Sequence, residues 1–295
     1  MARTHSSDSL HAATTTQAEV RSRRRPSTIP SEHAEGSVAS AKSAAVGPVA
    51  KVLRKPWYAF WRLVERRWYA GRTYSLSIPY GYRVFTPWFA TDERSEFTRM
   101  MRAARERGPL TKSADRCYML YQFSRSSLRS PADWAECGVH TGGTAHLLSL
   151  VAAQQPRPLH LFDTFSGMPT TAIKQRDYHA PGEFADTSLA LVQRRLSEFP
   201  FITLHPGELP GTFEEVARVD TYSFVHVDLD IYEAVMASCK WFWPRLCRGG
   251  IILFNDYGMY PYRYAGKAAI DTYFTEVEDG SIFILPTGQA VAIKH

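Results

Sequence analysis

Carboxylates and glycines fall at the ends of three predicted strands, with spacings that suit chemistry on a bound ligand. The segments are Trp134–Gly143 (WAECGVHTGG), Leu161–Asp163 (LFD) and Val225–Asp230 (VHVDLD). A glycine turn after a strand lets a ligand approach the backbone, and an acid ending the next strand can accept bonds from ribose hydroxyls. Later carboxylates can hold a metal ion or take a proton. The pattern indicates an enzyme that binds a nucleoside cofactor and does chemistry beside it.

The glycine turn reads Glu-x-Gly-x-x-x-Gly-Gly and differs from the Gly-x-Gly-x-x-Gly of dinucleotide-binding enzymes. Glu136, Gly138, Thr141 and Gly143 are the predicted cofactor-binding residues of this turn, because its glycines permit a tight turn and the next helix offers free N–H groups. Glu136 would oppose a phosphate but suits an ammonium group. This residue therefore favours S-adenosylmethionine, which carries a sulfonium and an amino-acid tail, over NAD.

Asp163 ends the second strand, 25 positions after Gly138. At that spacing an acid can accept hydrogen bonds from both ribose hydroxyls of a nucleoside cofactor. The alternative is an aspartate that only caps the following loop. The third predicted strand runs into Gly207 and Glu208, where we expect the adenine of the cofactor.

Asp228, Asn255 and Asp256 are predicted to converge at neighbouring strand ends. The strand before Asp228 is an apolar run that reads as buried on both faces, so Asp228 should emerge at the cleft. Three oxygen ligands with room for water suit Mg²⁺ or a similar cation. The alternative for each residue is a helix cap or a loop hydrogen bond, and Asp230 is the expected cap of the next helix. His226, inside the strand pattern, is predicted to be a core histidine.

The elements that must position these residues alternate along the chain from residue 133. Strands are predicted at 133–138, 158–162, 201–205, 222–228 and 249–255, with two closing strands at 281–285 and 289–294. Helices are predicted at 143–153, 185–198, 230–243 and 264–277. Strands separated by helices imply crossover connections and an α/β fold with a Rossmann-like, doubly wound, mostly parallel sheet. The short turn between the last two strands predicts an antiparallel C-terminal hairpin at one edge.

Three regions are predicted: a disordered basic tail (1–50), an aromatic and helical extension (51–127) and a Rossmann-like domain (128–295). Two amphipathic helices are expected between about 95 and 127. Residues 73–90 are expected to form an aromatic loop able to cover the site as a lid. The basic aromatic helix 56–69 is expected to dock on the main domain or, as a homo-oligomer contact, on a second copy; peripheral membrane contact is the less favoured alternative. The arginines at 21–25 read as part of a solvated tail, with nucleic-acid binding not expected.

Composition is ordinary for a globular chain: 295 residues, of which 44% are hydrophobic and 22% charged. The net charge of +6 is uneven, since residues 1–72 hold 13 Lys and Arg against 5 Asp and Glu. The basic character therefore says little about what the catalytic body binds. The four cysteines form no Cys-x-x-Cys pair, which argues against zinc and disulfides. With no predicted transmembrane or secretory segment, a cytoplasmic location is expected.

The stretch from about residue 75 to residue 295 resembles the macrocin O-methyltransferase family, the TylF/MycF group of metal-dependent sugar methyltransferases of antibiotic pathways. Five blocks in one order carry the resemblance: Ala135–Val139 (AECGV), Leu161–Pro169 (LFDTFSGMP), His226–Glu233 (HVDLDIYE), Gly249–Gly258 (GGIILFNDYG) and Lys267–Asp271 (KAAID). The resemblance implies a Rossmann-like methyltransferase domain, S-adenosylmethionine as donor and a small-molecule acceptor with a sugar-type hydroxyl. It implies that Asp228 is both a metal ligand and the catalytic base, with positions 255 and 256 completing the metal site.

One departure from the family concerns the predicted metal site. Asn255 stands where the family usually has an aspartate, which removes one negative charge and predicts weaker cation binding. Two alternatives remain open from the sequence. The first is a methyltransferase for a phenolic or amine acceptor, because loops build the acceptor pocket. The second is a non-catalytic Rossmann module associated with membrane or nucleic acid.

Overall fold

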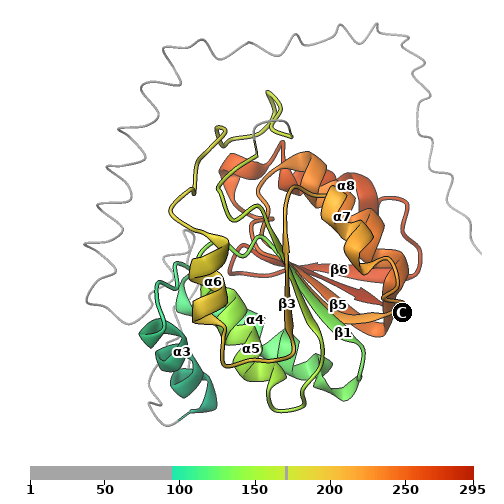
Figure 1. Ribbon diagram of the computed structural model, residues 1–295. Coiled ribbons are helices and arrows are strands. Elements are labelled where there is room, and N and C mark those ends of the chain that lie inside the picture. Colours follow the sequence, from blue (N-terminus) through green and yellow to red (C-terminus); the bar gives the residue numbers. More distant parts are fainter. Residues whose placement is uncertain (1–94, 170–171) are drawn as a thin grey trace, which may run out of the picture. The chain divides into compact units, whose positions relative to one another are not determined.

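The computed structural model of the chain describes residues 95–169 and 172–295 (Figure 1). The predictions for the tail 1–50, the helix 56–69 and the loop 73–90 lie outside the described residues. The expected oligomer or membrane contact through residues 51–90 lies outside them as well. The described residues hold the three strand endings on which the sequence analysis rests.

Seven strands form one mixed sheet in the order β3-β2-β1-β4-β5-β7-β6. Their bounds are β1 Asp133–Cys137, β2 Leu159–Asp163, β3 Ile202–Pro206, β4 Tyr222–Val227, β5 Leu246–Phe254, β6 Gly280–Ile284 and β7 Ala290–Lys294. Neighbours from β3 to β5 run parallel, whereas β7 runs antiparallel to both β5 and β6. The predicted doubly wound, mostly parallel sheet with an antiparallel C-terminal hairpin is confirmed. Its strand order reverses between β1 and β4, where such sheets bind ligands.

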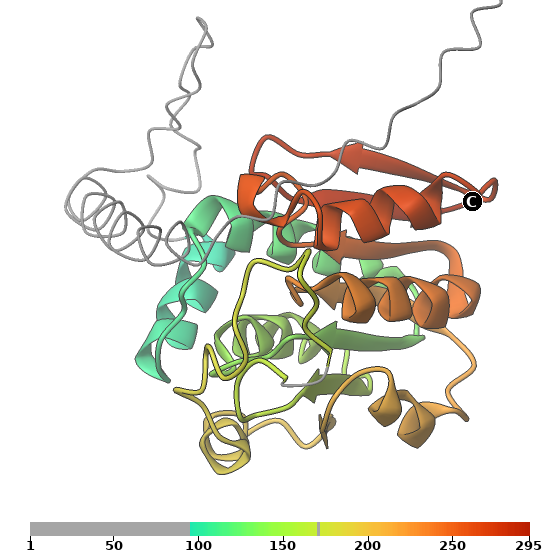
Figure 2. The same ribbon diagram turned by 90° about the horizontal axis from the view of Figure 1, so that it is seen from above.

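Helices cover both faces of the sheet, as Figures 1 and 2 show. On one face lie α3 Glu96–Glu106, α4 Ala114–Ser126, α5 Gly143–Ala152 and α6 Leu189–Arg195; on the other lie α7 Tyr232–Arg245 and α8 Gly266–Phe274. Short 3₁₀ turns occur at η1 Ser127–Arg129, η2 Gly211–Val216 and η3 Tyr260–Tyr262. Helices α3 and α4 belong to the predicted extension, yet they share one apolar core with α5. The connection between them is therefore held close to the sheet.

Each face of the sheet carries its own apolar core. Trp134 and Leu161 belong to the core under α4 and α5, whereas Ala135 and Phe162 belong to the core under α7 and α8. This division follows the alternation of side chains along a strand. All residues of β4 are buried, as the apolar sequence of a strand covered on both faces requires. Burial on both faces fixes β4 in the sheet, so its last residue delivers Asp228 to the ligand-binding edge.

Three helices begin later than the sequence predicts. The helix expected over 185–198 shortens to α6, because the side chain of Ser188 caps its first turn. The helix expected over 264–277 begins at Gly266. The helix expected from residue 230 begins at Tyr232, its N-cap is Ile231, and the N–H of Tyr232 donates to Asp177. The prediction that Asp230 caps α7 is therefore wrong, and its side chain is available for another role.

The sequence predicts neither a transmembrane helix nor disulfide bonds, and both predictions can be compared with the described residues. None of the helices within residues 95–169 and 172–295 has the length and apolar character that crossing a bilayer requires. All four cysteines lie in these residues and are free thiols. The absence of disulfides among them agrees with the prediction from their spacing.

Candidate active site

The glycine turn, residues 138–143, follows β1 and is built from residues in the left-handed region. Gly138, His140 and Gly142 have φ values of 89°, 50° and 81°. A Cβ added to Gly138 would lie 2.0 Å from the backbone carbonyl oxygen of Asp228. The backbone N–H of Asp228 also donates to the carbonyl of Cys137 at 2.8 Å. The glycine turn and Asp228 are thus in direct contact, and only glycine fits at position 138.

Asp163 anchors the glycine turn. Its Oδ2 accepts hydrogen bonds from the backbone N–H groups of Val139 and His140 at 2.7 and 2.8 Å. Its Oδ1 accepts from the N–H of Phe165 at 2.7 Å. Oδ2 thus accepts two bonds, and Oδ1 also receives a longer bond of 3.4 Å from the Thr164 hydroxyl. A ribose hydroxyl would therefore bond Oδ1 in place of the Thr164 hydroxyl. The sequence predicted the position of Asp163 but not its role in shaping the turn.

Glu136 lies in β1, and its side chain is 0% exposed. Its Oε1 lies 2.8 Å from Nδ1 of His226, which is buried as predicted for a core histidine. Its Oε2 is buried and has no hydrogen-bond partner within the described residues. A buried carboxylate oxygen without a donor is costly. A cationic ligand group reaching this oxygen would remove that cost.

The remaining predicted cofactor residues, Gly143, Gly207 and Glu208, lie at the same edge of the sheet as Asp163. Gly143 begins α5, where an added Cβ would lie 2.7 Å from the carbonyl oxygen of Pro109. The N–H of Gly207 donates to the backbone carbonyl of Asp163 at 2.9 Å, and the exposed Glu208 follows it. The ends of β1, β2 and β3 therefore meet as the topology requires.

Arg195 of α6 ties the glycine turn to the connection between α3 and α4, and the sequence analysis missed it. The residue is 5% exposed. Its guanidinium donates to the carbonyls of Ala104, Gly108, Pro109 and Thr141 at 2.8 to 3.0 Å. The planar guanidinium can make these four bonds at once because its N–H donors point in fixed, different directions. It fixes Thr141 and holds the α3–α4 connection over the start of α5.

Asp228, Asn255 and Asp256 converge beyond the ends of β4 and β5, as predicted. The Asn255 Nδ2 donates to Asp228 Oδ1 at 2.8 Å and to Asp256 Oδ2 at 3.1 Å. The amide oxygen of Asn255 instead faces Gln289, whose Nε2 lies 3.3 Å away. Asn255 therefore presents its donor, not its oxygen, to the two aspartates.

Asp230 brings a third carboxylate to this place. One oxygen each of Asp228, Asp230 and Asp256 lies within 4.8 Å of the others, and we call these three residues the acidic cluster. The Oδ1 of Asp230 is buried and accepts no hydrogen bond from the part of the chain that the structure describes. Hard oxygen ligands at this separation suit a divalent cation. The carboxylate trio thus includes Asp230, whereas the trio predicted from the sequence included Asn255.

Two cations reach the acidic cluster from the α3–α4 side. The Nζ of Lys112 lies 3.0 and 2.8 Å from the two carboxylate oxygens of Asp228. Arg116 donates to Asp256 Oδ1 at 2.7 Å. The sequence analysis missed both residues. A signal existed, because Lys112 precedes the N-cap of α4 and Arg116 lies in its first turn, where the helix dipole disfavours positive charge.

His179, in the loop after β2, reaches the acidic cluster from the opposite side. Its Nε2 lies 3.4 Å from Asp230 Oδ2 and 3.0 Å from the hydroxyl of Tyr262. Its Nδ1 lies 2.7 Å from Glu183 Oε2. Burial acts to lower the pKa of His179, but Asp230 and Glu183 outweigh it and raise the pKa. The sequence carried no signal for this residue, because a long irregular loop delivers it.

Burial dominates the electrostatics of the acidic cluster. It raises the pKa of Asp228, although Lys112 opposes the shift. Burial, with Asp256 adding to it, raises the pKa of Asp230 to about 7. Burial acts on Asp256 in the same direction, but Lys112 and Arg116 outweigh it and hold the pKa of Asp256 below its usual range. A carboxylate with a raised pKa is the better proton acceptor near neutral pH, which favours Asp228 or Asp230 for that task.

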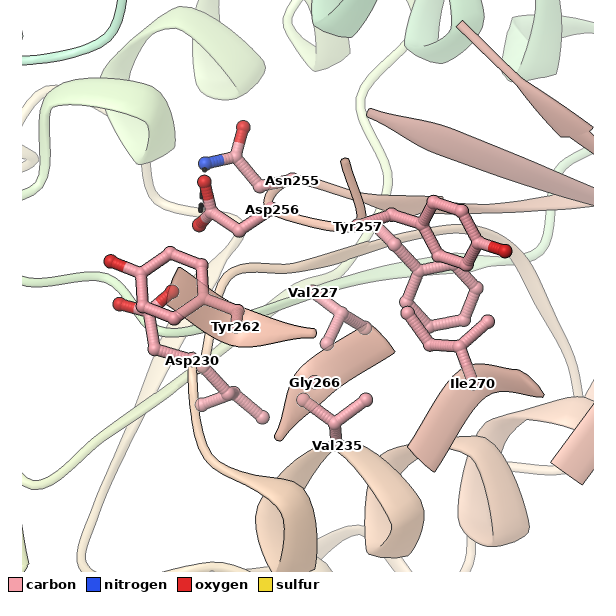
Figure 3. A pocket seen from close by; sticks show the side chains of 11 residues that line it. Val227, Asp230, Val235, Asn255, Asp256, Tyr257, Tyr262, Gly266 and Ile270 are labelled. Carbon is pink, nitrogen blue, oxygen red and sulfur yellow. Dashed lines mark hydrogen bonds between the residues drawn. The ribbon is translucent and has the colours of Figure 1, made fainter. Parts of the chain in front are cut away.

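A small pocket of about 20 Å³ lies beside the acidic cluster (Figure 3). Asp230 and Tyr262 lie at one end of it, and Val235 and Ile270 form an apolar wall. A volume of this size holds about one water molecule. The pocket can therefore solvate the carboxylates, but it does not hold a sugar.

A Rossmann-like sheet with a glycine turn and an acidic cluster at its switch point defines a class of nucleoside-cofactor enzymes. The family model described as macrocin-O-methyltransferase (TylF) matches residues 127–277. The chain belongs to this family. The resemblance drawn from the five sequence blocks is confirmed.

Similar proteins agree with this assignment. Demethyldecarbamoylnovobiocin O-methyltransferase of Streptomyces niveus is 26% identical over 155 residues, which are 48% of this chain and 58% of that protein. Mycinamicin III 3''-O-methyltransferase of Micromonospora griseorubida is 30% identical over 148 residues, 45% of this chain and 58% of that protein. The matched region therefore spans less than two thirds of either relative. The solved structure of the O-methyltransferase NovP shares the fold, with a TM-score of 0.54 at 22% identity over 64% of this chain and 82% of that one.

Proposed function

We propose that this chain transfers a methyl group from S-adenosylmethionine to a hydroxyl of a sugar or glycosylated natural product. The observation that carries the proposal is the contact between the glycine turn and Asp228, where a Cβ on Gly138 would lie 2.0 Å from the Asp228 carbonyl. A proton acceptor is thereby fixed beside the predicted cofactor site. Membership of the family and the names of the two relatives support the choice of reaction.

The residues at the strand ends fit the donor group by group. The unpartnered, buried Oε2 of Glu136 suits the ammonium of the amino-acid tail. Asp163 can accept a ribose hydroxyl at Oδ1 in place of the Thr164 hydroxyl, while Gly138, Thr141 and Gly143 let the backbone approach the ligand. Gly207 and Glu208 would flank the adenine. Bound there, S-adenosylmethionine supplies an electrophilic methyl group on its sulfonium.

Asp228 is the proposed catalytic base. Its carboxylate accepts the proton of the acceptor hydroxyl, a role that its raised pKa favours. Holding donor and acceptor in line supplies much of the rate.

We also propose that the reaction is assisted by a divalent cation such as Mg²⁺. Asp228 and Asp256 would hold the ion, as predicted, and the spacing of the carboxylates adds Asp230 as a ligand. Asn255 would contribute through its amide oxygen only if that group turned away from Gln289. When bound, the ion would lower the pKa of the acceptor hydroxyl.

The test is substitution of the base. Asp228→Ala should lower the rate of methyl transfer by about a thousandfold or more, while S-adenosylmethionine still binds. Product is followed by mass spectrometry as one added CH₂ group across glycosylated, phenolic and amine acceptors, and binding by calorimetry. Asp220→Ala, which removes an exposed aspartate, is the matched control.

Full activity of Asp228→Ala would refute the role of this residue. Methylation of phenols or amines in preference to sugars would replace the proposed acceptor class. A chain that does not bind S-adenosylmethionine would instead support the non-catalytic alternative.

A further inference from the structure

Lys112 stands at the place where a cation is expected, although it comes from outside the strand ends. It lies in the connection between α3 and α4, and its ammonium contacts both oxygens of Asp228 at 3.0 and 2.8 Å. The side chain of Lys112 is 24% exposed and that of Asp228 is 9% exposed. An ion pair with this degree of shielding is only weakly screened by salt. The contact is therefore a structural feature of the site and not a loose surface pair.

Other side chains of the protein also donate hydrogen bonds to the carboxylate oxygens of the acidic cluster. Asn255 donates to Asp228 and Asp256, and Arg116 donates to Asp256. With Lys112 and Arg116 against the three aspartates, ionised carboxylates leave one net negative charge. A divalent cation needs lone pairs on these same oxygens. Its entry therefore requires that the chain's own donors move away.

The two flanks of the acidic cluster differ in this respect. On the side of His179, Asp230 keeps a buried Oδ1 that accepts no hydrogen bond from the described residues. On the side of α4, both oxygens of Asp228 face the Lys112 ammonium. A cation could bind Asp230 without displacing a donor from its Oδ1, but it could not use Asp228 while Lys112 stays in place. Asp228 is therefore the ligand for which Lys112 and a metal ion would compete.

We propose that Lys112 is a tethered cation that competes with a divalent metal ion for Asp228 and so sets how tightly the acidic cluster binds metal. The inference deepens the proposed function and rests on it, because it concerns the same Asp228 that the proposal makes the base. Lys112 is a positioning residue here, because it acts through the carboxylate of Asp228. The presence of Asn255 in place of a further carboxylate strengthens the competition, because it lowers the charge that attracts the metal.

The experiment compares the affinity of the full-length chain for Mn²⁺ and Mg²⁺ by calorimetry, without cofactor or acceptor. Lys112→Met and Lys112→Gln should bind Mn²⁺ about tenfold or more tightly than the unaltered chain, because a unit charge next to the site is removed. Lys112→Arg keeps the charge and should bind as weakly as the unaltered chain. Lys240→Met removes an exposed lysine on α7 and should change nothing.

The location of the effect is tested in an Asp228→Asn background, where Lys112→Met should bring no gain in metal affinity. Equal or weaker Mn²⁺ binding by folded Lys112→Met and Lys112→Gln would overturn the proposal. An equal gain in Lys112→Arg would overturn it too, because charge would not be the cause. Folding is checked by near-ultraviolet circular dichroism. A separate titration with S-adenosylmethionine tests the proposed function, and failure there leaves the metal comparison standing.

Discussion

The glycine turn and the acidic cluster lie in contact but are built in opposite ways. Asp163 satisfies the turn through backbone N–H groups of Val139 and His140, which follow the neighbouring strand. The acidic cluster receives donors from three other segments: Lys112 of the α3–α4 connection, Arg116 of α4 and His179 of the loop after β2. The donors to Asp163 follow a neighbouring strand of the sheet, whereas the donors to the acidic cluster come from segments that pack over the sheet.

That difference separates two kinds of functional constraint. Residues of the turn must fit a backbone path, so their substitution should disturb folding and cofactor binding together. Residues of the acidic cluster must balance charge, so their substitution should disturb proton or metal affinity while the fold survives. Two contacts join the strands that carry these regions: Gly138 lies against the backbone of Asp228, and Glu136 of β1 is hydrogen-bonded to His226 of β4. Substitutions at these contacts should show the largest effects.

Gly138→Ala is expected to have the largest effect. The left-handed backbone costs an alanine about 1 to 2 kcal/mol, and the new Cβ would lie 2.0 Å from the carbonyl oxygen of Asp228. Backbone on both sides cannot move aside cheaply, so we expect a loss of about 5 kcal/mol in the free energy of unfolding. Denaturant titration measures it.

Gly182→Ala provides the matched control for that substitution. Gly182 has a similar φ of 77°, but an added Cβ would meet nothing within 4 Å in the described part of the chain. It should therefore lose only the backbone contribution, about 1 to 2 kcal/mol. Equal losses in the two variants would show that the turn and Asp228 are not in close contact.

His226→Leu should have the next largest effect, because it leaves Glu136 buried without its partner. Leaving a buried carboxylate without its hydrogen-bond donor costs about 1 to 3 kcal/mol or more. The double substitution Glu136→Leu with His226→Leu should recover most of this stability, since no buried charge remains. The double variant should still bind S-adenosylmethionine poorly. Recovery of both stability and binding would remove Glu136 from the cofactor site.

Asp163→Asn should weaken binding of S-adenosylmethionine roughly tenfold or more, because hydrogen bonds to a charged acceptor are worth about 1.5 to 3 kcal/mol. The amide also offers one oxygen where the carboxylate offers two, so one of its backbone donors loses its partner. Calorimetry measures the affinity. Asp186→Asn, a change at a mostly exposed aspartate near the same turn, is the control. Unchanged affinity in Asp163→Asn would leave this residue as an anchor of the turn only.

The fold could be predicted from the sequence almost in full. Alternating apolar strands and helices gave the sheet, and the short turn before Gln289 gave the antiparallel hairpin. Boundaries failed where one residue breaks a regular pattern. Asp230 reads as a helix cap by residue type, yet Ile231 takes that position, and Asp230, with its positive φ, brings its carboxylate to the acidic cluster. The periodicity of apolar residues in a sequence does not indicate where a single residue adopts a left-handed backbone conformation.

The site could be predicted only where strands deliver it. Asp163, Asp228 and Asp256 follow strands, so topology alone places them at one edge. Lys112 and His179 come from connections whose path the sequence does not fix. Basic residues at the first turn of α4 break the helix-dipole preference. Such a local conflict is the signal that could have drawn attention to Lys112 and Arg116.

The smallest effect concerns α5, the helix that the glycine turn opens. Burial lowers the pKa of His146, with Glu198 opposing the shift, and its Nδ1 has no hydrogen-bond partner among the described residues. As pH falls below about 6.5, the unfolded chain takes up this proton first. The stability contribution of a neutral His146 is therefore complete above about pH 6.5 and is lost as pH falls toward the folded pKa.

His146→Met should lose less stability than the unaltered chain between about pH 7.5 and 5.5 in thermal unfolding. Some slope should persist, because burial also lowers the pKa of His205. An identical slope in the variant would mean that His146 does not contribute and that other groups with lowered pKa values, such as His205, account for the acid sensitivity.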